Sequence, residues 1–196
     1  NGYRELRNTW LLLNKTVRLK RYLIAFFVLN MGIQTVMYLA ANFAKQEVKE
    51  INDEGAVVAI SDASLITSIL IIQLVAIAGA LAFVQLSKRF GNVRALMIGA
   101  CIWIGACLFA FTITWATEFY ALAVLVGLIM GGSQALSRST YAKFLPETKD
   151  TASFFSFYDV SYYMGTVLGT AAYGTVYAVT GDLRLTIVAI GSFFVL

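Results

Sequence analysis

The sequence predicts an all-α membrane protein, a polytopic bundle of six transmembrane helices. Six apolar segments follow one another between residues 22 and 196. The first five are close to the roughly 20 residues that a helix rising 1.5 Å per residue needs to cross a bilayer core. The composition is 59% hydrophobic and 13% charged, whereas soluble domains contain about 25% charged residues. A soluble domain of this size could not bury so much apolar surface.

The predicted helices are separated by short polar connectors, and their apolar runs are continuous, which argues against membrane strands. They cover residues 22–44, 63–86, 95–113, 119–135, 154–179 and 185–196. The last has 12 residues, about 18 Å of helix, which is too short to cross. We therefore expect a piece of a longer protein. In it, residues 22–196 form a transmembrane half-domain with a truncated last helix, and residues 1–21 form a linker.

Residues 3–20 combine apolar positions at helical spacing with basic residues. Leu6, Trp10, Leu13 and Val17 recur on one face, with arginines on the others. A tryptophan among basic residues beside a membrane indicates an interfacial helix, and a solvated linker with chance periodicity is the alternative.

Lysine and arginine are distributed unevenly between alternate connectors. Three of them lie on one predicted side: Lys45, Lys49 and Arg184. Twelve lie on the other: Arg4, Arg7, Lys15, Arg18, Lys20, Arg21, Lys88, Arg89, Arg94, Arg138, Lys143 and Lys149. The side with the excess is predicted to be cytoplasmic, and it includes the N-terminal tract.

The residue types present exclude several classes of function. The chain has no histidine, the commonest metal ligand and general base, and Cys101 and Cys107 lack metal-ligand spacing and read as apolar fillers. No phosphate-binding Gly-x-x-x-x-Gly-Lys motif of an ATP-driven pump occurs. We expect no catalytic residue, metal or cofactor. The net charge of +4 is explained by membrane orientation and needs no nucleic-acid partner.

Polar side chains inside the first predicted span form one stripe. Asn30, Gln34 and Tyr38 are spaced by four residues, so they share a helix face. An unpaired amide in hydrocarbon is costly, so the stripe should face protein or water. Two interpretations remain open, a wall of a substrate pathway and interhelical hydrogen bonds that join the bundle.

The fourth and fifth predicted spans carry opposite charges at similar depth. Gln134, assigned to the pathway, shares a face with Arg138. Asp159 is the only acidic residue inside any predicted span. We hypothesise that Arg138 and Asp159 pair as part of a gate. Snorkelling of Arg138 to headgroups and proton coupling by Asp159 are the alternatives.

The same two spans carry tyrosines and closely spaced glycines. Tyr162 and Tyr163 are candidate pathway residues, and their alternative place is the inner membrane interface. Small residues at i and i+4 let helices approach closely, which predicts packing positions. These are Gly127, Gly131, Gly165 and Gly169.

Three stretches resemble the major facilitator superfamily, in the branch related to vacuole effluxers. They are residues 28–36 (VLNMGIQTV), 73–80 (QLVAIAGA) with 88–91 (KRFG), and 131–139 (GGSQALSRS) with 154–158 (FFSFY). The resemblance implies spans seven to twelve of a twelve-span carrier in a bacterial inner membrane, one half of a major-facilitator fold. Its partner would be the N-terminal half. Gln73 joins the predicted pathway and Arg89 the predicted gate. The superfamily's loop motif is degraded here, with Val84 and Lys88 in place of its Gly and Asp.

The resemblance implies a secondary active transporter that moves a small solute by alternating access. Amino acids or related metabolites are the class it implies, and the predicted partners are that solute, the lipid bilayer and the N-terminal half. The alternative is a non-transporting membrane scaffold or a membrane-embedded enzyme subunit, although no converging catalytic groups are visible in the sequence.

Overall fold

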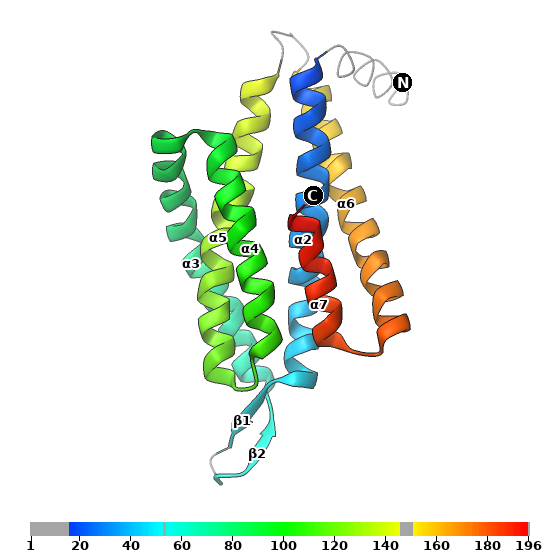
Figure 1. Cartoon of the computed structure of the whole chain (residues 1–196). Coiled ribbons are helices and arrows are strands. Elements are labelled where there is room, and N and C mark those ends of the chain that lie inside the picture. Colours follow the sequence, from blue (N-terminus) through cyan, green and yellow to red (C-terminus); the bar gives the residue numbers. More distant parts are fainter. Residues whose placement is uncertain (1–15, 53, 146–150, 196) are drawn as a thin grey trace.

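The computed structural model describes residues 16–52, 54–145 and 151–195, and these form a helical bundle with one small hairpin (Figure 1). The six α-helices of this part are α2 (Val17–Glu47), α3 (Asp62–Phe90), α4 (Asn92–Thr112), α5 (Ala116–Phe144), α6 (Thr151–Thr180) and α7 (Leu183–Gly191). A short 3₁₀ turn, η1 (Ser192–Phe194), continues α7. The strands are β1 (Lys49–Ile51) and β2 (Val57–Ala59).

Four of these helices, α2 to α5, are long and apolar enough to cross a membrane, judged by length and composition among the described residues. Helix α6 has 30 residues, but its tyrosines, threonines and glycines make it less apolar. Helix α7 has nine residues. The prediction of an all-helical, multi-span protein is therefore confirmed, and length with composition supports four of the six predicted spans.

Helices α2, α3, α5 and α6 begin and end outside the predicted apolar segments, whereas α4 and α7 begin before theirs and end within them. Helix α5 runs nine residues beyond the predicted end at Ala135, to Phe144. Apolar composition marks only the part suited to lipid, and a helix continues while the backbone allows it. Pro146 follows shortly, and the residue before a proline disfavours helical geometry. Helix α2 begins at Val17, so residues 17–20 of the predicted interfacial helix belong to α2, and residues 3–15 lie outside the described residues.

The connector between α2 and α3 contains the hairpin, which the sequence analysis did not predict. Its antiparallel strands pair Lys49 with Ala59 and Ile51 with Val57. Both carboxylate oxygens of Glu50 are used, because one accepts the Ser61 amide at 3.0 Å and the other the Ser64 hydroxyl at 2.6 Å. The hairpin is thereby fastened to the start of α3.

Figure 1 shows α3, α4 and α5 grouped on one side of the bundle and α2, α6 and α7 on the other. The most extensive packing joins α3 to α5 and α2 to α6, and α4 contacts both α5 and α7. We call the end with the hairpin the hairpin end. The opposite end is the basic end, and it contains the start of α2, the α3–α4 turn, the end of α5 and the start of α6.

Glycines lie where the two main helix pairs approach most closely. A Cβ atom on Gly131 would meet the backbone carbonyl of Ala76, and one on Gly127 would lie 2.8 Å from the Ile72 carbonyl oxygen. On the other pair, a Cβ on Gly169 would lie 2.7 Å from the Met31 carbonyl oxygen. A Cβ on Gly165 would approach the Asn30 amide at 3.2 Å. The α3–α5 and α2–α6 contacts therefore depend on backbone approach without side chains between the helices.

The main core lies between α2, α4, α5 and α7, where Trp103 is fully buried and stacks on Phe194 with ring centroids 5.5 Å apart. A second apolar cluster lies at the basic end, where α2, α5 and α6 meet. In it the Phe26 and Tyr158 rings stack with centroids 4.3 Å apart. The Tyr141 hydroxyl donates to the Phe154 carbonyl at 2.7 Å. Phe26 and Tyr158 of this cluster also line the site described next.

Candidate functional site

A polar cleft of about 440 Å³ lies between α2, α5 and α6. It occupies the part of the bundle nearer the basic end, because its residues fall in the first half of α2, the second half of α5 and the first half of α6. Its polar lining consists of Asn30, Ser133, Gln134, Ser137, Arg138, Tyr158, Asp159, Tyr162 and Tyr163. Two long apolar helices, α2 and α5, and the less apolar α6 thus place amides, hydroxyls and two opposite charges around one space.

One wall of the cleft is a hydrogen-bonded network between α2 and α6. The Asn30 amide donates to the Tyr162 carbonyl at 2.8 Å. The Gln34 amide donates to the Tyr162 hydroxyl and, at 3.4 Å, to the Asn30 side-chain oxygen. Asn30 is 3% exposed and Gln34 is 7% exposed, so both amides are paired inside the bundle. Both also contribute to the geometry of the cleft, since Asn30 lines it and Gln34 holds the Tyr162 ring.

The two charged residues of the lining, Arg138 and Asp159, lie close to each other. The Arg138 Nη1 atom lies 3.8 Å from the Asp159 Oδ1 atom, and the side chains are 59% and 48% exposed. The guanidinium also lies over the Phe155 ring, 5.4 Å from its centroid, and over the Tyr158 ring at 6.0 Å. A pair at this separation and exposure is weak. Both groups can therefore bind a third polar group without first breaking a strong contact.

Three predicted site residues lie elsewhere. Tyr38 is 65% exposed on α2, toward the hairpin end from the cleft. Gln73 is exposed on α3, which contributes no lining residue. Arg89 is at the end of α3, with its guanidinium 5.8 Å from the Phe90 ring centroid, and is not among the residues at the charge pair. The structure thus brings together Asn30, Gln134, Arg138, Asp159, Tyr162 and Tyr163, with Gln34 behind them.

A hydrogen-bonded network around Asn92 at the basic end was missed by the sequence analysis. Asn92, which follows the positive-φ Gly91, accepts the Ser87 hydroxyl at 2.8 Å and the Lys143 ammonium at 3.2 Å. Its amide donates to the Thr140 hydroxyl at 3.0 Å. The α3–α4 turn is thereby tied to α5. An asparagine beside a glycine between two long helices was the available signal.

The sequence is similar to curated proteins that are longer than it. It is 25% identical over 196 residues to the uncharacterized MFS-type transporter YxiO of Bacillus subtilis, covering all of this chain and 43% of that protein. It is 28% identical over 198 residues to autophagy-related protein 22-1 of Phaeosphaeria nodorum, covering 92% of this chain and 33% of that protein. It is 28% identical over 176 residues to autophagy-related protein 22 of Yarrowia lipolytica, covering 83% of this chain and 27% of that protein. The chain thus spans less than half the length of these relatives.

Long apolar helices around a polar cleft, together with these relatives, define a multi-pass membrane protein of the major facilitator transporter class. Within that class the family described as vacuole effluxer Atg22 like matches residues 1–196. The chain belongs to this family. The resemblance drawn from residues 28–36, from 73–80 with 88–91, and from 131–139 with 154–158 is confirmed.

Proposed function

We propose that this chain is the C-terminal half of a secondary active transporter that moves a small polar solute across a membrane by alternating access. The carrying observation is the cleft between α2, α5 and α6, in which paired amides, tyrosines and the Arg138–Asp159 pair surround one space. Sites of such carriers lie between two repeats near the middle of the bilayer. Amino acids or related metabolites fit a lining that offers a cation, an anion and neutral donors.

Exposed polar side chains at the cleft and on α3 support a second half of the transporter as the partner. Gln134 lines the cleft yet is exposed, and Tyr163 is 67% exposed. Gln73 places an amide on the exposed apolar face of α3, beside Leu74, which is 69% exposed. A lipid-facing amide at this depth would lack a partner. We infer that the N-terminal half of the transporter covers these faces and that lipid covers the rest.

In this proposal the distribution of lysine and arginine sets the orientation of the protein in the membrane. The basic end faces the cytoplasm, α6 and α7 complete six crossings, and the membrane is the bacterial inner membrane. Helix α6 crosses in this proposal although it is less apolar, because several of its polar and small residues face protein: Gly165 and Gly169 pack on α2, and Tyr162 is hydrogen-bonded to Gln34. Arg89 and the Asn92 network then lie on the cytoplasmic side, where they act on the α3–α4 turn.

The proposal predicts that solute uptake depends on the cleft. In proteoliposomes with the full-length protein, Asn30→Ala and Gln134→Ala should lower uptake of an accumulated amino acid by roughly tenfold, the effect of about 1.4 kcal/mol. Uptake should be measured with and without a proton gradient. Leu108→Ala, at an exposed position of α4 outside the cleft lining, is the control and should retain uptake. Unchanged uptake in both cleft variants would remove the site assignment.

A further inference from the structure

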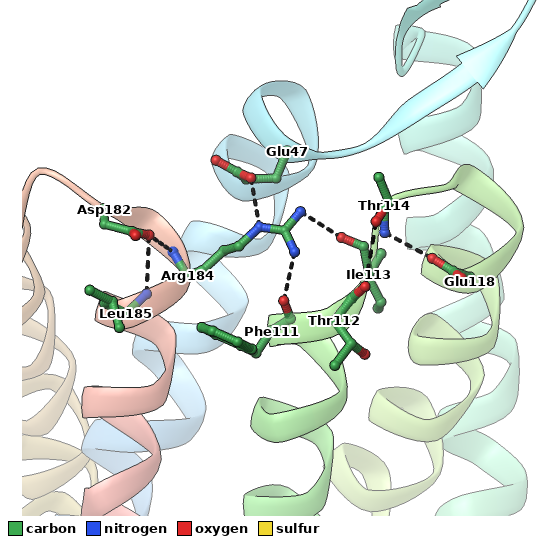
Figure 2. A network of polar contacts seen from close by, with 9 residues as sticks. All are labelled: Glu47, Phe111, Thr112, Ile113, Thr114, Glu118, Asp182, Arg184 and Leu185. Atoms are coloured by element: carbon green, nitrogen blue, oxygen red, sulfur yellow. Dashed lines mark hydrogen bonds and ion pairs between the residues drawn. The ribbon is translucent and has the colours of Figure 1, made fainter.

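The hairpin end carries a second polar assembly, at the opposite end of the bundle from the cleft. It joins the end of α2, the end of α4 and the start of α7 through one side chain, Arg184 (Figure 2). These helices meet here from positions more than 60 residues apart in the sequence. Arg184 is one of the three basic residues that the charge distribution places on the side opposite the predicted cytoplasmic side. Because basic residues are scarce on that side, we expect Arg184 to have a specific partner.

Arg184 uses all three nitrogens of its guanidinium. The Nε atom donates to the Glu47 carboxylate at 2.7 Å, at the last residue of α2. The Nη1 atom donates to the Phe111 carbonyl at 2.6 Å and the Nη2 atom to the Ile113 carbonyl at 2.8 Å. Carbonyls at the end of a helix lack intrahelical partners and carry the negative end of the helix dipole, so a cation that caps them is favoured.

Both sides of this contact are held in place by local hydrogen bonds. Gly181 has a φ of 65°, which allows the sharp turn from α6, and Asp182 caps α7 by accepting the Arg184 and Leu185 amides at 2.8 and 3.2 Å. On the other side, Glu118 accepts the Thr114 amide at 2.8 Å (Figure 2). The Thr114 carbonyl accepts the Lys49 amide at 2.8 Å. Donor and acceptors are therefore pre-positioned.

A second ion pair at the same end provides a contrast. Lys45 and Asp62 approach to 2.8 Å, but their side chains are 56% and 80% exposed, whereas those of Arg184 and Glu47 are 24% and 31% exposed. Exposed pairs contribute little to stability, and charge-assisted bonds in fixed fork geometry contribute more. The Lys45–Asp62 pair is thus a matched control from the same surface.

We propose that Arg184 is a clamp that holds the hairpin-end termini of α2, α4 and α7 as one rigid unit. The helix α2 spans from this clamp to the wall of the cleft at Asn30 and Gln34. The hairpin end of α2 therefore does not move separately from α4 and α7. The consequence for transport, that access changes by motion at the basic end of α2 or of the whole unit, rests on the proposed function.

The clamp is tested by hydrogen–deuterium exchange on the full-length protein in nanodiscs. In Arg184→Ala, amides at residues 44–48 and 184–188 should exchange about tenfold faster, since charge-assisted bonds are lost at both segments. Arg184→Lys keeps the charge, but a lysine cannot present three fixed donors, so faster exchange is expected there as well. Lys45→Ala should leave residues 184–188 unchanged.

The outcomes separate the clamp from the proposed function. Exchange that is unchanged in Arg184→Ala and Arg184→Lys, or equally faster in Lys45→Ala, overturns the clamp whatever the transport assay shows. Faster exchange confined to the two Arg184 variants supports the clamp even if the wild-type protein proves inactive in uptake. If Arg184→Ala does not fold, the comparison of Arg184→Lys with Lys45→Ala decides.

Discussion

Exchange of Gly131 for alanine is expected to destabilise the bundle by about 1–3 kcal/mol, the usual cost of forcing a methyl group into a packed site. The added Cβ would meet the backbone carbonyl of Ala76 on α3, which cannot rotate away as a side chain can. Helices α3 and α5, which share the most extensive contact in the described part of the fold, would have to separate. The measurement is reversible unfolding of the full-length protein in mixed micelles titrated with SDS.

The control for Gly131 is a glycine in an equally regular helix with open space around it. A Cβ on Gly105 of α4 meets no atom within 4 Å. Gly105→Ala should stabilise slightly, by about 0.5–1 kcal/mol, because alanine loses less backbone entropy in a helix. Opposite signs at the two positions are expected. Equal effects would mean that the α3–α5 contact does not depend on close backbone approach.

Removal of either member of the Arg138–Asp159 pair is expected to lower solute uptake about tenfold, because each charge is proposed to contact the solute in the cleft, and a lost contact of about 1.4 kcal/mol is a factor of ten. Arg138→Gln and Asp159→Asn keep the approximate shape of each side chain. The double exchange, Arg138→Asp with Asp159→Arg, should recover part of the uptake lost in the single charge variants if the pair acts as a gate. Uptake into proteoliposomes by the full-length protein measures all of these.

The charge pair has two distinguishable alternatives. If Asp159 couples transport to protons, Asp159→Asn should abolish the response to a proton gradient while Arg138→Gln preserves it. If Arg138 only reaches toward headgroups, Arg138→Gln should transport normally. A double exchange that recovers nothing beyond the single variants would contradict the pairing.

The helices could be predicted from the sequence because membrane-crossing length and apolarity are local properties. The positions of Gly91 and Pro146 explain where α3 and α5 end, yet apolar segments alone placed the end of α5 nine residues early. The hairpin was missed because its strands have three residues each and depend on Glu50, Ser61 and Ser64. Such contacts depend on how the chain turns, and the path of the chain cannot be read from amino-acid composition.

The cleft could be predicted in part, for a physical reason. A polar side chain inside an apolar helix must face protein or water, so Asn30, Gln134 and Asp159 pointed to the interior surface of the bundle. The same rule led to Tyr38 and Gln73, but the structure leaves both exposed and outside the cleft. In the proposed transporter, contact with a further part of the protein would satisfy the rule for them. Arg184 could not be predicted as a clamp, since two of its acceptors are backbone carbonyls of Phe111 and Ile113.

Access to the cleft from the two sides of the membrane tests the central claim most directly. In full-length protein with Cys101 and Cys107 replaced by alanine, Gln134→Cys should react with a membrane-impermeant maleimide added from either side, and the transported solute should slow both reactions. Leu108→Cys, at an exposed position of α4 outside the cleft lining, is the control position. Alternating access predicts that Gln134→Cys is labelled from both sides. Labelling from one side only, or from neither, would contradict it.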